Sequence, residues 1–154
     1  MDDLPALLRF YRSLSPLVVR AYRPYGYDVT EAALRDGPFK RLAEGDEYAF
    51  VIADAADEIF GHAFLSRVRS QEAHFGIGVH QSLLGRGWGR RLMGALMEGS
   101  ERDLALRSID LRVLKDNGAA NRLYESFGFE RTGELTDAAD GLEYYLMVKR
   151  CAAT

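Results

Sequence analysis

The chain has 154 residues, 47% of them hydrophobic, which suffices for one packed core, so we expect a single domain spanning residues 1–154. Acidic and basic residues are interspersed and sum to a net charge of −3, without the long basic tract of a nucleic-acid-binding protein. With one cysteine, Cys151, and no Cys/His cluster at metal-ligand spacing, we expect a reducing compartment and no structural metal. The N-terminus opens with acidic residues where a signal peptide needs basic ones, and no apolar run is long enough to span a membrane. We therefore expect a cytoplasmic protein that binds neither nucleic acid nor membranes.

The first half of the chain combines helical and strand patterns. Apolar residues recur at helical spacing from Leu4, and Ser15 before Pro16 resembles a new N-cap, so the first helix should break and resume there. Further on, Thr30 is a typical N-cap and Gly45 a typical helix end. These patterns predict an interrupted helical region from Leu4 to about Tyr22, short helices at residues 30–34 and 38–44, and an antiparallel hairpin of strands at 47–53 and 58–68.

The second half alternates strands with helices. A strand at residues 73–80 turns Phe75, Ile77 and Val79 to one face, and the helix after the following glycine turn carries an apolar stripe. Beyond that helix we expect a strand at 108–113, a helix at 117–127, and two strands at 129–135 and 142–149 around an acidic turn. This order predicts a mixed α/β sheet with at least one parallel βαβ unit.

The junction between that strand and helix, residues 79–93 (VHQSLLGRGWGRRLM), has glycine at alternate positions. The first N–H groups of a helix lack intrahelical partners and carry partial positive charge, so anions bind there. Glycine lets the backbone approach the anion, and arginine adds charge-assisted donors. The pattern lacks the spacing of a dinucleotide or nucleotide phosphate loop. Two interpretations stand, a pyrophosphate site or a turn whose basic residues are solvated, and the residues concerned are Gly85, Arg86, Gly87, Gly89, Arg90 and Arg91.

A second group of polar residues falls on the predicted helix at 117–127. Asn117 and Tyr124 are seven residues apart and so lie on one face, with Asn121 close beside it. Residues in this arrangement can contact one ligand together. The alternative makes Asn117 an ordinary N-cap and Tyr124 a core aromatic residue with its hydroxyl at the rim.

Together, the glycine turn and the later sequence VLKDNGAANRLYESFGFE resemble the GNAT superfamily of acyl-CoA-dependent N-acetyltransferases. The family pattern has a [QR]-G-x-G-x-[GA] turn and, one strand later, N-x-x-A-x-x-L-Y-x-x-x-G-F, which the chain matches from Asn117 to Phe129. The resemblance implies a mixed, mostly antiparallel central sheet with a parallel splayed pair of strands and helices on both faces. It also implies acetyl-CoA as cosubstrate, no metal, and direct transfer of acetyl to a primary amine of a small molecule or protein.

The resemblance assigns roles to residues on the third strand, the glycine turn and the later helix. The thioester carbonyl would take a backbone N–H near Gly78 or Val79, with pantetheine between the splayed strands. Tyr124 would protonate the departing thiolate, and Asn117 would bond the pantetheine arm. The residues expected to bind the cofactor are Ile77, Gly78, Val79, Leu84, Gly85, Arg86, Gly87, Trp88, Gly89, Arg90, Asn117 and Asn121.

The general base is expected on the third strand. His74 aligns with the place where many relatives carry Glu, and imidazole titrates near neutrality, so His74 is the first choice. Glu72 is the reserve, and His62 and His80 are lower choices. The alternative for His74 is a histidine hydrogen-bonded at the sheet surface.

The chain departs from the family pattern at two places. Leu84 stands where the family usually has Gln or Arg, so one side-chain contact to phosphate should be missing. Met1 nearly abuts the first helix, so the usual preceding strand should be absent, which would leave a sheet edge open or completed by a second copy in a homodimer.

The acceptor amine should lie between the first helical region and the last hairpin. The hairpin's acidic and aromatic residues suit a cation, although solvation alone also explains an acidic turn. A non-catalytic acyl-CoA sensor is the rival function, and a longer acyl chain is also open. The residues expected around the acceptor are Tyr22, Tyr25 and Tyr27 on one side and Asp137, Asp140, Glu143, Tyr144 and Tyr145 on the other.

Overall fold

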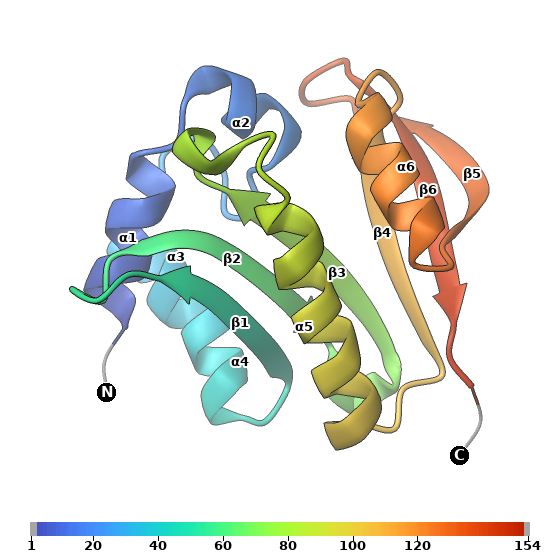
Figure 1. Cartoon of the computed structure of the whole chain (residues 1–154), viewed down its shortest axis with the longest axis horizontal. Coiled ribbons are helices and arrows are strands. Elements are labelled where there is room, and N and C mark those ends of the chain that lie inside the picture. The colour runs from blue at the N-terminus through green and yellow to red at the C-terminus, as the bar shows by residue number, and fades with distance from the viewer. Residues whose placement is uncertain (1–2, 153–154) are drawn as a thin grey trace.

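A six-stranded sheet runs through residues 3–152, the part of the chain that this computed structural model describes (Figure 1). The strands are ordered β1-β2-β3-β4-β6-β5, and every neighbouring pair is antiparallel except β3 with β4. The predicted mostly antiparallel sheet with one parallel pair is therefore confirmed. The strands are β1 (Glu47–Ala53), β2 (Ile59–Ser66), β3 (Glu72–Val79), β4 (Ser108–Leu114), β5 (Glu130–Thr136) and β6 (Glu143–Arg150).

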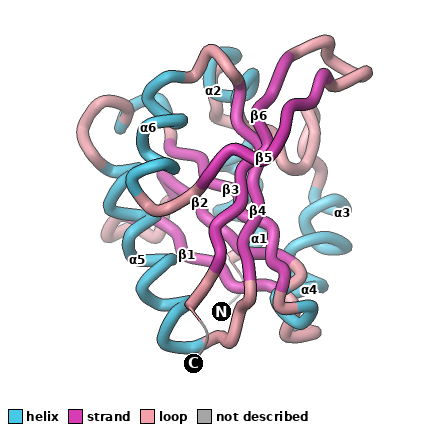
Figure 2. Tube along the Cα trace, turned by 90° about the vertical axis from the view of Figure 1, so that its right-hand side faces the viewer, coloured by secondary structure: helices cyan, strands magenta, loops and turns pink. Residues whose placement is uncertain are grey.

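Helices cover both faces of the sheet, as expected: α1, α3 and α4 lie on one face and α5 and α6 on the other (Figure 2). The predicted N-caps Ser15 and Thr30 accept hydrogen bonds from the Val18 and Ala33 amides. Short 3-10 turns at Val68–Ser70 and Gln81–Leu83 flank β3. The helices are α1 (Leu4–Arg12), α2 (Pro16–Ala21), α3 (Glu31–Leu34), α4 (Lys40–Ala43), α5 (Trp88–Asp103) and α6 (Gly118–Ser126).

The helical segment before β1 differs from the prediction of two separate helices. Residues 31–43 form one continuous run whose middle, Arg35–Phe39, is a π-helical turn that contains Pro38. Proline has no N–H to donate and crowds the preceding turn, and the wider π turn accommodates it. β2 is shorter than predicted because Arg67, at φ 60°, turns the chain out of the strand. The other strand boundaries differ by about one residue, the ordinary scatter of such assignments.

β3 and β4 pair over only a short length. Beyond the pair His74 and Asp110 their registered pairing ends, and the strands diverge toward the glycine turn (Figure 1). The sheet therefore consists of two parts, β1-β2-β3 and β4-β6-β5, joined at one end of the parallel pair. This confirms the splayed pair implied by the family resemblance.

Two hydrophobic clusters attach the helices to the sheet. The larger cluster includes Met93 and Leu96 of α5, which pack with Phe75 of β3 and confirm the predicted apolar stripe. The smaller cluster joins Phe10 of α1 to Phe64 of β2. Because side chains alternate along a strand, the residues of β3 that do not face α5 lie on the face toward α1 and α2, and these are Glu72, His74, Gly76 and Gly78.

β1 forms one edge of the sheet. The expectation that no strand precedes the first helix falls on Met1, which with Asp2 lies outside the described residues, and α1 begins at Leu4. A homodimer built through this edge stays a prediction. Within residues 3–152, no helix is both long and apolar enough to cross a membrane.

Candidate active site

The glycine turn brings unpaired amide groups to the start of α5. Gly85 and Gly87 have φ angles of 72° and 81°, a left-handed conformation that favours glycine. The first amide to bond back across the turn is that of Arg91, to the Gly87 carbonyl at 3.2 Å. The amides of residues 88–90 therefore have no intrahelical acceptor. A Cβ added at Gly85, Gly87 or Gly89 would meet no atom within 4 Å, so the turn is open.

The arginines of the turn have different surroundings. Arg86 is exposed and makes no hydrogen bond or ion pair within the described part of the chain. Arg90 donates to the Ser126 hydroxyl at 3.1 Å, and Arg91 lies 4.3 Å from the centre of the Trp88 ring. Leu84, next to the turn, is 51% exposed and offers no hydrogen bond. Arg86 is thus free to meet an anion at the turn, and Arg91, although stacked on Trp88, makes no hydrogen bond or ion pair within the described residues either.

Two glycines open the face of β3 that looks toward α1 and α2. A Cβ at Gly76 would lie 2.4 Å from the Phe64 ring, and one at Gly78 would lie 2.0 Å from the Tyr22 ring. The two rings therefore rest directly on the strand backbone. Since β3 has parted from β4 at this point, the backbone of Gly78 borders the gap between the strands.

His74 is held by a carboxylate from the neighbouring strand. Its Nδ1 lies 2.7 Å from Asp110 Oδ1, and Arg67 donates to the other carboxylate oxygen at 3.1 Å. A carboxylate on Nδ1 favours the tautomer with its hydrogen there, which leaves Nε2 as an acceptor. This contact confirms the alternative of a histidine hydrogen-bonded at the sheet surface. The role of His74 as general base stays a prediction.

The other candidate bases have different environments. Glu72 is exposed at the first residue of β3. His80 shares a hydrogen bond of 2.7 Å with the Ser82 hydroxyl in the turn after β3. His62 is 3% exposed, its Nδ1 lies 2.6 Å from the Tyr11 hydroxyl, and burial lowers its pKa to about 3. His62 is therefore neutral and enclosed by protein.

Tyr124 packs against the opposite side of β3. Its ring makes edge-to-face contacts with Phe75 and Phe129, with ring centres 5.9 and 6.3 Å apart. Burial raises the pKa of the Tyr124 hydroxyl well above its ordinary value. The phenol therefore stays protonated throughout the physiological range.

The two asparagines at the start of α6 are both tied to the backbone. Asn117 caps the helix by accepting a hydrogen bond from the Ala120 amide at 3.2 Å. The Asn121 amide donates to the carbonyls of Leu114 and Asn117, while its Oδ1 is buried without a hydrogen-bond partner. The capping and packing interpretations of Asn117 and Tyr124 are thus correct, and their ligand contacts stay predictions.

A cavity of about 630 Å³ contains His74 and lies on the α1 side of the sheet. Gly76 and Arg112 line it where β3 and β4 part, and the rest of its lining consists mainly of aromatic residues and further arginines. A second cavity, of about 710 Å³, includes Cys151 and Gln71 and lies at the other end of β3 from the glycine turn. The cysteine is therefore away from the candidate site.

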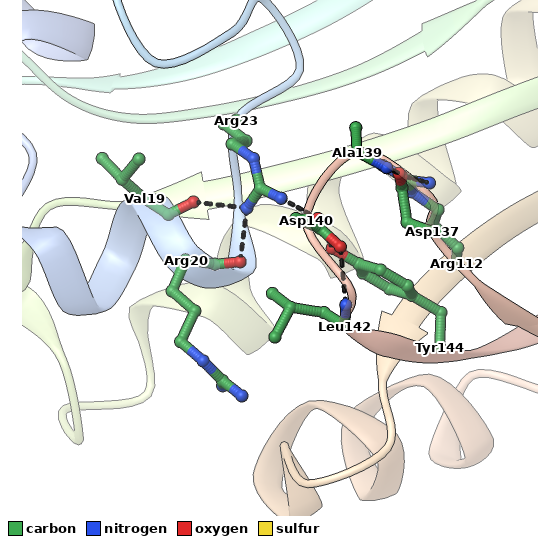
Figure 3. Close-up of polar contacts among 9 residues, drawn as sticks. All are labelled: Val19, Arg20, Arg23, Arg112, Asp137, Ala139, Asp140, Leu142 and Tyr144. Atoms are coloured by element: carbon green, nitrogen blue, oxygen red, sulfur yellow. Dashed lines mark hydrogen bonds and ion pairs between the residues drawn. The ribbon is translucent and has the colours of Figure 1, made fainter.

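The acidic residues of the last hairpin are engaged in ion pairs. Figure 3 shows Arg23, from the loop after α2, meeting Asp140 of the β5-β6 turn, which also accepts from the Tyr144 hydroxyl at 2.9 Å. Asp137 is paired with Arg112 at 3.0 Å. These contacts differ from the expectation that free acids face a cationic acceptor, because arginines neutralise both carboxylates.

Sequence analysis did not single out Asp110, Arg67 or Arg112. Alternation along β4 already puts Asp110 and Arg112 on the face opposite the core. Their proximity to His74, however, depends on the register of β3 against β4, which no local pattern contains.

In this sheet the central parallel pair of strands opens beside the first residues of a helix, whose amides are unpaired. This is the arrangement of an acyltransferase. A family model described as Acetyltransferase (GNAT) family matches residues 8–129. The chain belongs to this family of acetyltransferases, which confirms the resemblance found in the sequence.

Individual proteins are also similar to the chain in sequence. The L-amino acid N-acetyltransferase AaaT of Escherichia coli is 30% identical over 113 residues, 64% of this chain and 70% of that protein. An uncharacterized protein of Mycobacterium leprae is 36% identical over 124 residues, 73% of this chain. The chain spans about a third (33%) of that second protein's length.

Solved structures share the fold. The spermidine N-acetyltransferase of Vibrio cholerae, in complex with CoA and spermine, superposes with a TM-score of 0.75 at 23% identity. The match covers 96% of this chain and 89% of that one. At this level of identity the likeness shows a common fold.

Proposed function

We propose that the protein moves an acetyl group from acetyl-CoA directly to the primary amine of a small molecule or protein, with both substrates bound at once. The observation that carries the proposal is the opening between β3 and β4 beside the unpaired amides of α5. The position of Cys151 in the other cavity supports transfer without an acyl-enzyme. By their names, two relatives act on an L-amino acid and on spermidine, so both small-molecule classes are represented among similar proteins.

The residues at the opening fit a CoA thioester. The amides of residues 88–90 and the exposed Arg86 supply donors for a diphosphate, and the open glycine turn leaves room for it. Asn121, whose buried Oδ1 lacks a partner, would accept an N–H of the pantetheine arm. Asn117 uses its oxygen as a cap and keeps its amide to donate. The backbone of residues 77–79 would border the thioester.

The side chains around the opening divide the proton transfers between them. Acetyl-CoA supplies an acetyl group activated as a thioester. His74, held through Nδ1 by Asp110, would take the ammonium proton through water at Nε2. A backbone N–H near Gly78 would stabilise the negative charge that develops on the carbonyl oxygen. Tyr124 would give its phenolic proton to the sulfur as the carbon–sulfur bond breaks.

The experiment that tests this function measures release of free thiol from acetyl-CoA across a panel of amines. Tyr124→Phe should lower kcat by about 100-fold or more, because it removes the acid. The affinity for CoA, measured by calorimetry, should stay within a few-fold, since the ring and its packing remain. Tight CoA binding by the native protein without thiol release for any amine would instead identify an acyl-CoA sensor.

A further inference from the structure

The cavity that contains His74 is lined by arginines from four separate segments. They come from the loop after α2, from α4, from the loop after β2 and from β4. No Asp or Glu is among the described residues that line it. The four arginines are Arg23, Arg41, Arg67 and Arg112.

Three of these arginines keep donors to spare. A guanidinium has five N–H groups. Arg41 uses its Nε on Glu47, Arg67 one Nη on Asp110, and Arg112 one Nη on Asp137. Their other N–H groups make no further hydrogen bond within residues 3–152.

Arg23 differs from the other three. Its guanidinium bonds the carbonyls of Val19 and Arg20 as well as Asp140, and its side chain is only 12% exposed (Figure 3). Its hydrogen bonds connect parts of the fold, so it is not counted here as a ligand-binding group.

Arg67 and Arg112 are the two arginines that connect to His74 and to the gap between β3 and β4. Arg67 bonds the same carboxylate as His74. The last registered pair of β3 and β4 is His74 with Asp110. If that register is continued by two residues, Arg112 lies opposite Gly76, at the point where the strands have parted. At about 3.3 Å per residue, Gly76 lies about 7 Å along β3 from Gly78. A small molecule of a few bonds can therefore reach both the arginines and the gap.

We propose that the acceptor is an amine that also carries a carboxylate, an amino acid, with the carboxylate bound by Arg67 and Arg112 and the amine beside β3. This inference rests on the proposed function and names the substrate class for the same site. Planar guanidinium groups bind carboxylates bidentately, which fixes the orientation of the amine. A polyamine brings no such group, so it leaves the spare N–H donors of these arginines without a partner.

The first test compares matched acceptors with the native protein: a free amino acid, its carboxamide and the corresponding decarboxylated amine, for several side chains. The amide's amine is less basic and therefore more often neutral, so basicity alone favours the amide. We expect kcat/KM for the acid to exceed that of the amide by about 100-fold or more, because charge-assisted bonds are lost. Equal or better reaction of the carboxyl-free amines, spermine included, overturns the inference and leaves the proposed function intact.

The second test uses variants at the proposed carboxylate site. Arg112→Gln and Arg67→Gln should each raise KM for the acid at least tenfold and lower the acid-to-amide ratio of kcat/KM by a similar factor. Arg67→Gln should also slow the reaction of both acceptors, because Arg67 bonds the Asp110 carboxylate that holds His74. Arg69→Gln, in the same loop as Arg67 but outside the cavity, is the matched control and should behave as the native protein. Equal losses for acid and amide would overturn the inference. A protein that binds CoA but releases no thiol with any acceptor fails the proposed function itself, and the inference fails with it.

Discussion

Two buried titratable residues respond to pH in opposite directions. Burial lowers the pKa of His62 from 6.5 to about 3. Burial raises the pKa of Glu47 from 4.5 to about 7, although Arg41 at 3.0 Å opposes the change. Between pH 4.5 and 6.5 the folded chain therefore holds one proton more than the unfolded chain on Glu47 and one fewer on His62. Their contributions to the pH dependence of stability cancel in that range.

Single substitutions should reveal the two opposing effects. In Glu47→Gln the His62 effect remains, so the free energy of unfolding should fall as the pH drops from 6.5 to 5, by up to about 1.4 kcal/mol per pH unit. In His62→Asn the Glu47 effect remains, and stability should fall as the pH rises from 5 to 7. Urea unfolding at several pH values measures both slopes. Slopes of the same sign in the two variants would contradict this account.

At the scale of single residues, the sequence could identify those site residues whose spacing along one helix or strand places them together. Asn117 and Tyr124 could be named because seven positions on a helix fix a common face, and His74 because it aligns with the place on this strand where many relatives carry Glu. Asp110 could not, since its contact with His74 crosses 36 positions between two strands.

At the scale of elements, β3 depends on glycines that accept neighbouring rings. Gly76 lies under the buried Phe64 ring, whereas Gly89, in the first turn of α5, faces open space. Replacement of glycine by alanine should therefore change the stability of the fold in opposite directions at these two positions.

Gly76→Ala should lower the free energy of unfolding by about 1–3 kcal/mol, because the added methyl group forces the Phe64 ring from its place. Gly89→Ala should raise it by about 0.5–1 kcal/mol, because alanine has less backbone entropy to lose in a helix. Urea unfolding of the unliganded variants measures both changes. A neutral Gly76→Ala would show that the ring moves away at no cost.

Periodicity predicted most elements because apolar spacing reports which face of each segment is buried. It failed at residues 31–43, where Pro38 normally signals an interruption. The chain continues there through a π turn, and Leu34 beside it is fully buried in the smaller cluster. Tertiary packing, which no local pattern records, favours the continuous segment.

At the scale of the whole molecule, two ion pairs link the parts of the sheet on either side of the gap. Arg20 of α2 pairs with Asp116 after β4 at 2.8 Å, with both side chains well exposed. Arg23 pairs with Asp140, whose side chain is 6% exposed. Burial distinguishes the two links, since solvent screens the first and not the second.

Arg23→Met should destabilise the protein by about 3–5 kcal/mol, because it leaves the Asp140 carboxylate buried without its cation. Arg20→Met should cost much less than Arg23→Met, because solvent screens this exposed pair. Urea unfolding of both variants at the same pH gives the comparison. Similar losses for the two would show that burial does not set the strength of these links.

The acceptor side of the site was the part least accessible from sequence. The acids of the last hairpin suggested a cationic acceptor, but Asp140 meets an arginine 117 positions away, and Asp137 meets another. The net charge of a cavity depends on such long-range pairs. Local composition therefore did not reveal the charge of this region, and the position of the acceptor, which the family resemblance implies, stays a prediction.

The order of the strands has a consequence for biosynthesis. β6 lies between β4 and β5, although it follows both in the chain. A nascent chain that has emerged only to residue 142 thus has β4 with a bare edge and β5 with no neighbour. The segment bearing Asp110 and Arg112 gains its lateral support only when residues 143–150 leave the ribosome. Until then, β4 is paired on one side only, with β3, and β5 has no pairing partner.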